Sequence, residues 1–177
     1  MHFRIATLVC AALAVLCAMP FAASAAPAGH CAADEALIFT CPVGGQKLLS
    51  ICASREYGPD LGFLQYRYGP PGKPEMVLPA ARTAPAKAAE SGRWMFSGGG
   101  GAYARFVNGT TAYYVYTAVG KWGKKGEIME KAGVAVKKDG KVIADIRCRG
   151  PETSELGPEF FDKAGLPEVA DEFDLPE

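Results

Sequence analysis

Ser97 is the residue of this chain whose setting most resembles that of a catalytic nucleophile, because four consecutive glycines at 98–101 follow it. In a hydrolase, the amides of such glycines can stabilise an oxyanion while a histidine activates the serine hydroxyl. The surrounding residues do not support this chemistry. Ser97 lies outside any Gly-x-Ser-x-Gly motif, no helix is predicted after it, and His30, the one histidine beyond the N-terminal leader, is expected in a mobile N-terminus. A hydrolase that uses Ser97 is therefore kept only as an alternative, and we expect a protein that is not an enzyme.

Other chemistries also lack the residues they need. The glycine run has neither the Lys-Ser/Thr pair nor the following helix of a phosphate-binding loop, and the acidic residues of the body are scattered singly rather than paired as in glycosidases. Tyrosines interleaved with Lys and Arg suit single-stranded nucleic acid, but an exported protein with an acidic tail is a poor candidate for that ligand. We therefore expect no cofactor and no nucleic acid.

The glycine run has two interpretations, a tight connection between strands or a recognition loop. Glycine loses more backbone freedom on folding than any other residue, so four in a row indicate close approach to another surface or conformations that side chains forbid. Tyr, Gly, Ser and Arg are also the residues that make contact surfaces in binding proteins. The binding hypothesis assigns a loop of Ser97, Gly98, Gly99, Gly100, Gly101 and Tyr103 and a supporting face of Arg105, Tyr114, Tyr116, Lys121 and Lys124. In the alternative, the tyrosines only pack beneath a loop or the C-terminal helix, and the protein is a structural component of the cell envelope.

Short strands joined by glycine-containing turns must position these residues. The clearest hairpin is centred on Asn108-Gly109, between 102–107 and 110–119, and it pairs Arg105 with Ala112. Because side chains alternate along a strand, the three tyrosines and the arginine share one face, which we predict to be an amphipathic surface. The opposite, more apolar face is the candidate core face.

Further turns and breaks predict the remaining elements. Gly44-Gly45 and Asp139-Gly140 each separate two apolar runs, as two-residue hairpin turns do. The strands outside the central hairpin are expected at 37–43, 46–52, 62–68, 75–78, 93–96, 133–137 and 142–148. We expect an exposed loop with a helical turn at 79–92 and a short helix at 156–164, capped by Ser154 and stopped by Gly165. This pattern predicts a mainly β fold, a single antiparallel β-barrel or sandwich of about eight strands with a short C-terminal helix.

The first 25 residues have the pattern of a cleaved secretory signal peptide. A short positive start precedes an apolar run at 5–19, and Ala23-Ser24-Ala25 supplies the small-x-small cleavage site. The apolar run is too short to span a membrane. We expect a periplasmic or secreted protein with no membrane span, a β domain at 26–150, and a short helix with a frayed acidic tail at 151–177.

Charge is distributed unevenly between the predicted domain and its tail. Residues 26–150 hold 17 Lys and Arg against 10 Asp and Glu, whereas residues 151–177 hold one lysine against nine acids. Such a tail ordinarily keeps a protein soluble, and the alternative is that it folds back over a basic face.

Four cysteines remain after the predicted cleavage, and they predict two disulfides. Cys31, Cys41, Cys52 and Cys148 allow three pairings, and Cys148 is placed to tie the last strand to the first hairpin. There is no Cys-x-x-Cys pair, and the cysteine spacings with a single histidine fit no common zinc site. We expect no metal.

Three short motifs, taken in order, resemble those of the bacterial periplasmic lysozyme inhibitors. Residues 39–44 (FTCPVG) resemble the Tyr-x-Cys-x-x-Gly opening of the c-type inhibitors, Ser97-Gly98 followed by Tyr103 resembles the Ser-Gly-x-x-Tyr loop shared by several inhibitor families, and 122–126 (WGKKG) resembles their Trp-x-Lys-Gly segment. The chain also resembles a widespread group of exported bacterial proteins to which no role is assigned.

The resemblance to the inhibitors implies a small antiparallel β-barrel or sandwich that blocks a lysozyme, a protein partner, by steric and electrostatic means. It implies that the loop 97–103 enters the lysozyme cleft, where the Ser97 hydroxyl and glycine amides donate hydrogen bonds to the catalytic carboxylates. It further implies that Lys121 or Lys124 pairs with one of those acids. The loop here is two residues longer than in the motif.

Overall fold

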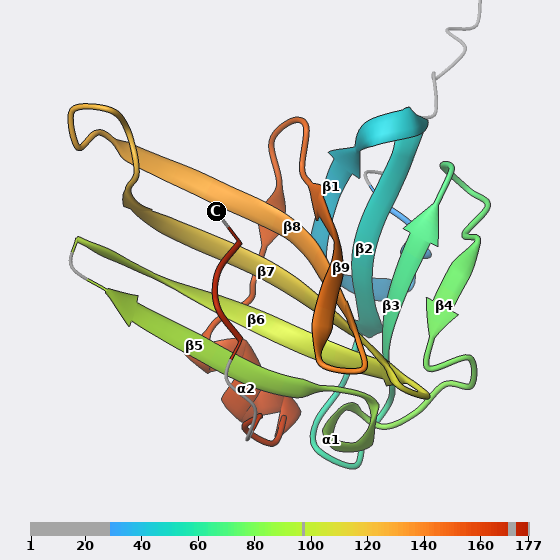
Figure 1. Cartoon of the computed structure of the whole chain (residues 1–177). Helices are drawn as coiled ribbons and strands as arrows, with labels where there is room; N and C mark the ends of the chain where they lie inside the picture. Colours follow the sequence, from blue (N-terminus) through green and yellow to red (C-terminus); the bar gives the residue numbers. More distant parts are fainter. Residues whose placement is uncertain (1–28, 97, 170–172, 177) are drawn as a thin grey trace, which may run out of the picture.

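Ten antiparallel strands in two sheets form the β-sandwich of Figure 1. The computed structural model describes residues 29–96, 98–169 and 173–176, so the predicted signal peptide and Ser97 lie outside the described residues. Within that part of the chain, the first sheet has the strand order β10-β1-β2-β3-β4 and the second the order β5-β6-β7-β8-β9. The predicted mainly β class is confirmed, in its open sandwich form.

The two sheets differ in strand length. The first consists of β1 (Glu35–Val43), β2 (Lys47–Ser54), β3 (Leu64–Gly69), β4 (Met76–Leu78) and β10 (Thr153–Ser154). The second consists of β5 (Glu90–Phe96), β6 (Gly99–Asn108), β7 (Thr111–Lys121), β8 (Ile128–Lys138) and β9 (Lys141–Arg147). The helical segments are the 3-10 turn η1 (Gly44–Gln46), α1 (Pro85–Ala88) and α2 (Pro158–Ala164). The longer strands β6–β8 carry the second sheet past the first, at the left of Figure 1.

The hairpin turns occur at the predicted glycines, but two of the three differ from the prediction in strand register or length. At β8–β9 the predicted two-residue turn is confirmed, because Asp139 and Gly140 both have positive φ, as a type I′ turn requires. The predicted turn at Asn108-Gly109 is displaced by one residue: Asn108 pairs with Thr111, and only Gly109 of the two turn residues has a positive φ, the pattern of a type II′ turn. Arg105 therefore pairs with Tyr114 and not Ala112, although every side chain keeps its predicted face.

The β1–β2 connection is also longer than predicted. Val43 pairs with Lys47, so the three residues of η1 connect the strands, and both Gly45 and Gln46 have positive φ. The segment predicted as an exposed loop at 79–92 contains α1 and the start of β5. It is not fully exposed, because Pro85, Ala88 and Ala89 are buried beside the core.

The core lies between the two sheets and is closed at one end by α2. Tyr66 of β3 packs its ring 5.9 Å from that of Phe106 on β6, which joins the sheets across the interior. Phe160 and Phe161 of α2 are buried in the same cluster. Gly165 ends α2 in the left-handed conformation, as predicted. Ser154 does not cap the helix, because it belongs to β10 and pairs with Phe39 of β1, and Gly157 occupies the N-cap position.

Two disulfides, Cys31–Cys52 and Cys41–Cys148, link the first sheet to its neighbours. The second joins β1 to the residue after β9, so the prediction that Cys148 ties the last strand to the first hairpin is confirmed. Disulfides are typical of oxidising compartments outside the cytosol, which is consistent with a periplasmic or extracellular location. In the part of the chain that the structure describes, no helix has the length and apolar character needed to cross a bilayer.

Candidate functional site

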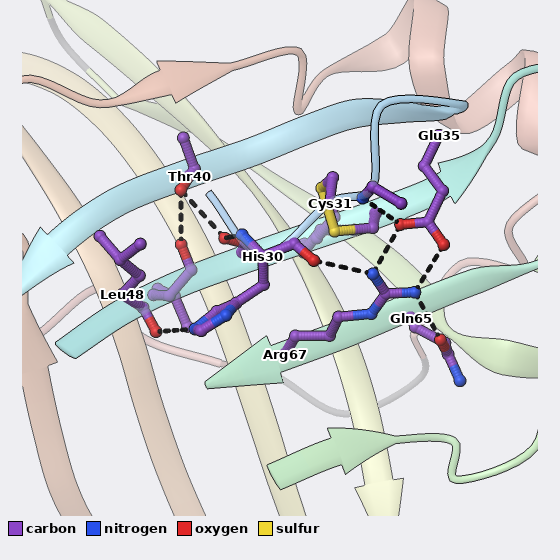
Figure 2. Close-up of a disulfide and its surroundings, with 12 residues drawn as sticks. His30, Cys31, Glu35, Thr40, Leu48, Gln65 and Arg67 are labelled. Atoms are coloured by element: carbon purple, nitrogen blue, oxygen red, sulfur yellow. Dashed lines mark hydrogen bonds and ion pairs between the residues drawn. A yellow bond between two sulfur atoms is a disulfide. The ribbon is translucent and has the colours of Figure 1, made fainter. Parts of the chain in front are cut away.

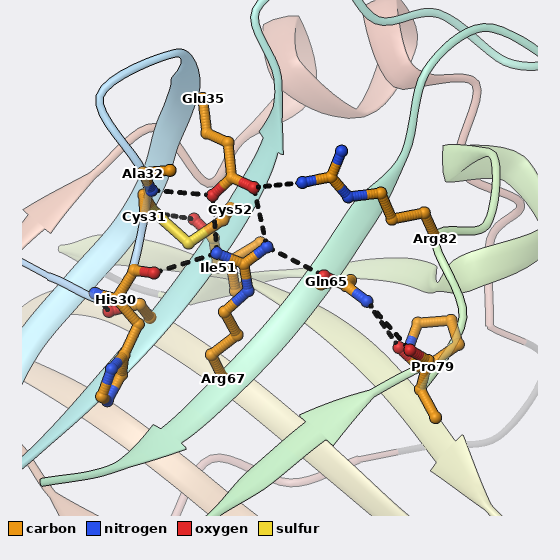
Figure 3. A network of polar contacts seen from close by, with 12 residues as sticks. His30, Cys31, Ala32, Glu35, Ile51, Cys52, Gln65, Arg67, Pro79 and Arg82 are labelled. Atoms are coloured by element: carbon orange, nitrogen blue, oxygen red, sulfur yellow. Dashed lines mark hydrogen bonds and ion pairs between the residues drawn. A yellow bond between two sulfur atoms is a disulfide. The ribbon is translucent and has the colours of Figure 1, made fainter. Parts of the chain in front are cut away.

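The densest polar cluster of the described residues lies on the outer face of the first sheet, where Arg67 is its centre (Figure 3). Its guanidinium donates to both carboxylate oxygens of Glu35, at 2.6 and 2.9 Å, and to the backbone oxygen of His30 at 2.9 Å. The Glu35 side chain is only 3% exposed. Burial by itself raises the pKa of Glu35, but the hydrogen bonds from Arg67 and from the amide of Ala32, with the Arg67 charge, bring the pKa below its ordinary value. Both carboxylate oxygens of Glu35 already accept hydrogen bonds from the protein, so we assign this cluster a structural role and not a binding role.

His30 is held by backbone carbonyls and is not part of a mobile terminus (Figure 2). Its Nε2 lies 3.2 Å from the oxygen of Leu48 and 3.1 Å from that of Gly69, and because carbonyls only accept, this nitrogen carries the proton. Nδ1 is buried without a hydrogen-bond partner among the described residues. The prediction of a mobile His30 is therefore wrong, because the ring fills a site between β2 and β3. Neither ring nitrogen bonds a described hydroxyl group.

One trio of potential metal ligands occurs within the described residues, and it adjoins this cluster. It consists of Cys31, Cys52 and Glu35. The two sulfurs are bonded to each other and Glu35 is engaged by Arg67, so no thiolate or open carboxylate faces the trio.

The glycine run forms a tight hairpin rather than an extended loop. Phe96 pairs with Gly99, so two residues connect β5 to β6, and Gly98 has a φ of +80°. Gly99, Gly100 and Gly101 belong to β6, which pairs with β5 on one side and β7 on the other. The predicted loop from 97 to 103 is therefore wrong in its extent, because strand pairing on both sides satisfies backbone groups that a free glycine loop would leave to solvent. The glycine run is thus a tight β-connection in its geometry, and a role of its tip in recognition stays a prediction.

The glycines are required where neighbouring groups approach the strand. A Cβ on Gly101 would lie 2.6 Å from Cβ of Ala118 and 2.8 Å from Cε3 of Trp94. A Cβ on Gly99 would overlap the backbone oxygen of Val119. The sequence suggests two reasons for the glycine run, and one of them is close approach to another surface. In the structure, that surface is the neighbouring strands of the same sheet.

The predicted face of three tyrosines and an arginine exists but is not an exposed surface. Tyr103, Tyr114 and Tyr116 are 5, 2 and 0% exposed. Arg105 bonds Glu90 and donates to the Tyr114 hydroxyl at 3.2 Å. The expectation of an amphipathic contact surface is wrong, because residues 173–176 cross this face, with Phe173 stacked on Tyr114 at 4.1 Å. The tyrosines pack beneath the C-terminal segment instead of the C-terminal helix, and the described part of that tail is not frayed.

Two hairpin tips meet at the far end of the second sheet. A Cβ on Gly98 would lie 2.9 Å from Cδ of Lys121, and the rings of Phe96 and Trp122 are 5.4 Å apart. Both tips project past the first sheet at the left of Figure 1. We call these tips, residues 95, 96, 98–100 and 119–129, the distal end. Of the predicted binding residues, the structure brings Gly98 against Lys121, with Gly99 and Gly100 following Gly98 in β6. Lys124 lies in the β7–β8 turn, three residues after Lys121, and Tyr103, Arg105, Tyr114 and Tyr116 lie elsewhere.

The distal end exposes an unusual amount of apolar surface. Met95 and Ile128 are 90% and 69% exposed, and Met129 and Val119 are also exposed. Lys121, Lys124 and Lys125 stand beside them and are exposed, and no ion pair with another described residue involves them. Strand register places Met95, Val119 and Ile128 on one face of the sheet and Met129 on the other. Exposed apolar side chains with charged neighbours are typical of contact surfaces.

A groove of about 390 Å³ runs along the inner face of the same strands. Met95, Gly100 and Val119 occupy neighbouring register positions on this face, and Leu156 and Pro158 form the opposite wall. Its polar lining residues are Arg93, Thr117, Glu130 and Glu152. Because Gly100 and Ala102 provide no side-chain bulk, the floor of this distal groove is largely backbone.

Sequence reasoning missed Met95, Ile128 and the distal groove. One signal was available in the sequence. Alternation puts Met95, Gly100 and Val119 on one face of the sheet, and the missing side chain of Gly100 between two larger ones predicts a depression there. The wall from 156–158 could not be found in this way, since it comes from a distant segment. Comparisons of the chain with protein-family models, curated proteins and solved structures gave no match.

Proposed function

We propose that this protein is an exported binding protein whose distal end inserts into the acidic cleft of a protein partner, and that the partner is a lysozyme. One observation carries the proposal. Two of the three segments that resemble the inhibitor motifs adjoin: Gly98 of the first lies against Lys121, which is 23 residues further along the chain and directly precedes the second. Motif resemblance alone does not require this contact.

The surface chemistry of the distal end suits such a cleft. Met95 and Ile128 offer apolar area that a partner can bury, and a fully buried side chain of this kind contributes about 1.5–3 kcal/mol. Lys121 and Lys124 can pair with the carboxylates that a glycosidase cleft must contain, and a charge-assisted hydrogen bond contributes about 1.5–3 kcal/mol. The formal net charge of the chain is zero at pH 7, so affinity would come from contact more than from long-range steering.

The contact set differs from the one that the resemblance implies. Tyr103 is buried on the outer face, so it supports the strand and does not touch a partner in this conformation. Gly100 and Gly101 are paired on both sides and present no open edge to a ligand. The proposed contacts are therefore the tip at 98, the lysines of the β7–β8 turn and the exposed apolar side chains; Ser97 lies at this tip in the sequence, outside the described residues.

The test is inhibition of cell-wall clearing, followed by turbidity, with lysozymes of the c, i and g types and the protein without residues 1–25. The wild-type protein should inhibit at least one type at a stoichiometry near one to one. The double variant Lys121→Glu/Lys124→Glu should weaken inhibition by about tenfold or more, the loss expected for one charge-assisted contact. The matched control is Lys138→Glu/Lys141→Glu, at the β8–β9 turn at the other end of β8, which should inhibit like the wild type.

Two results would contradict the proposal. Absence of inhibition of all three lysozyme types would remove the lysozyme as partner. Equal loss in both double variants would show that overall charge matters and the distal end does not.

A further inference from the structure

The outer face of the second sheet holds an aromatic trough that is separate from the distal groove. Its rings are Trp94 of β5, Tyr103 of β6 and Tyr114 of β7, which lie side by side on adjacent strands. Phe173 lies among them, with ring centroids at 5.4, 5.2 and 4.1 Å respectively, and is 3% exposed. The segment from Phe173 to Pro176 crosses the strands in Figure 1.

This segment is held as a bound peptide is held. The indole Nε1 of Trp94 donates to the backbone oxygen of Phe173 at 2.6 Å, and Nζ of Lys131 donates to that of Pro176 at 3.0 Å. Within the described residues, 173–176 pair with no strand. The buried ring of Phe173, the partly buried Leu175 and two side-chain contacts to carbonyls attach the segment, a pattern typical of peptide recognition in a groove.

The trough is shaped by the strands beneath it and not by the segment above it. The ring of Tyr103 lies directly over Gly92, and that of Trp94 lies against Gly101, where any Cβ would collide with it. Arg105 donates to the Tyr114 hydroxyl and is itself bonded to Glu90. Trp94 loses its hydrogen bond to Phe173 when the segment leaves, but the other supports belong to the sheet. We therefore expect the three rings to keep their places and to form an exposed aromatic patch in that state.

Charge around the trough favours an acidic ligand. Nζ of Lys137 lies 5.7 Å from the centroid of the Phe173 ring and 5.5 Å from that of Tyr114, and Lys131 lies at the Pro176 end. Asp174 follows the anchor directly, and residues 151–177 hold nine acids and one lysine. An aromatic side chain among carboxylates thus matches both the apolar floor and the basic rim.

We propose that the aromatic trough is a binding site for an acidic peptide segment of a partner protein with an aromatic anchor, and that Phe173–Pro176 occupy it as a displaceable resident ligand. The tethered segment has an effective concentration in the millimolar range. A second copy of the chain would present the same segment at a lower concentration than the tethered one, so it cannot compete for the trough. The displacing ligand must therefore be a segment of a different protein that binds more tightly. The proposal is independent of the proposed action on a lysozyme.

The experiment uses the full mature chain and a synthetic peptide with the sequence of residues 170–177 (ADEFDLPE). Isothermal titration calorimetry, with tryptophan fluorescence as a second readout, compares the wild type with Phe173→Ala. If the resident segment is docked more than nine-tenths of the time, removal of its anchor should tighten the apparent affinity for the peptide by about tenfold or more. Phe173→Leu should give a smaller gain. The control Ile143→Ala, an exposed apolar residue of β9, should bind like the wild type.

The anchor is tested by a peptide with alanine in place of phenylalanine, which should bind no variant measurably. Equal peptide affinity of the wild type and both Phe173 variants, or binding of the alanine peptide as tight as that of the parent, would overturn the proposal. Circular dichroism identifies a Phe173→Ala chain that fails to fold, in which case the leucine variant decides. A wild type that runs as a dimer in size-exclusion chromatography with light scattering would contradict the assignment to a different protein.

Discussion

The first sheet and the distal end are stabilised in opposite ways. In the first sheet, Cys31–Cys52 crosslinks the segment before β1 to β2, and Arg67 forms a two-bond ion pair with the buried Glu35. The distal end is a pair of hairpin tips built on three strand glycines. It leaves Met95 and Ile128 exposed, and it is not crosslinked within the described residues.

This difference indicates that the residues that stabilise the fold and the residues that would bind a partner lie in different parts of the molecule. Covalent and ionic constraints are concentrated where side chains are already buried, and the region without them carries the apolar surface and the lysines that a partner can use. Binding surfaces are commonly drawn from the less stable parts of a fold, held in position by a rigid remainder. If this comparison is correct, changes in the first sheet should alter the free energy of unfolding, and changes at the distal end should alter binding alone.

The largest effect on stability is expected from the disulfide that joins the two sheets. Removal of Cys41–Cys148, which spans 107 residues, should lower the free energy of unfolding by about 5 kcal/mol, because a long closed loop restricts the unfolded chain most. Removal of Cys31–Cys52, which spans 21 residues, should cost about 3 kcal/mol. Urea unfolding of the two double Cys→Ala variants gives both numbers. The reverse order would mean that local packing, and not loop length, determines their contributions.

The next effect is expected from Arg67→Ala, which removes both short hydrogen bonds to the buried Glu35 carboxylate and leaves it with the exposed Arg82 at 3.3 Å and the amide of Ala32 at 2.9 Å. Because Arg82 still compensates part of the charge, the free energy of unfolding should fall by about 3 kcal/mol, the lower end of the range for a broken buried ion pair. Arg93→Ala is the matched control, since Arg93 lines the distal groove and is exposed, and it should change stability by less than about 0.5 kcal/mol. Urea titrations of both variants at neutral pH test the comparison, and equal losses would refute it.

Acidification should weaken the first sheet through the same carboxylate. The folded-state pKa of Glu35 is below its ordinary value, so its contribution to stability is present above the unfolded-state pKa and is lost as the pH falls through the folded-state pKa. The free energy of unfolding should therefore decline below about pH 4.5. Measured by urea unfolding between pH 7 and 3, the decline should be shallower in Glu35→Gln, which has no proton to take up at this position. An identical slope in the variant would assign acid sensitivity to other groups.

Local signals predicted the scaffold of the first sheet well. Turn glycines located the hairpins, and an even cysteine count with Cys148 after the last long strand predicted two disulfides and one of their roles. The register of β6–β7 was missed because Asn108-Gly109 and Gly109-Thr110 both make acceptable two-residue turns, and no short-range rule decides between them. The error moves each partner residue by two positions, so every side chain stays on the predicted face of the sheet.

The distal end and the aromatic trough could not be predicted because their surroundings come from distant segments. Nothing near Tyr103, Tyr114 and Tyr116 in the sequence indicates that Phe173 covers them. His30 likewise owes its position to the carbonyls of Leu48 and Gly69. An amphipathic face predicts that a surface will be contacted, and it does not distinguish contact by the same chain from contact by a partner.

The smallest effect on stability is expected at the distal end itself. Met95→Ser/Ile128→Ser should change the free energy of unfolding by less than about 0.5 kcal/mol for each site, since both side chains are mostly exposed in the free protein. The same variant should weaken inhibition by about tenfold or more, because a partner that buries such side chains gains about 1.5–3 kcal/mol from each. Urea unfolding and the turbidity assay measure the two quantities on one preparation.

Val142→Ser/Ile143→Ser on β9 is the matched control for this last prediction, because it removes a similar exposed apolar area from the opposite edge of the same sheet. It should leave both stability and inhibition unchanged. A loss of stability in the Met95/Ile128 variant would mean that these side chains support the hairpin tips, and the contrast between the two regions would then disappear. Unchanged inhibition with unchanged stability would instead show that Met95 and Ile128 do not contact the partner, and it would favour Lys121, which lies against Gly98, as a contact residue.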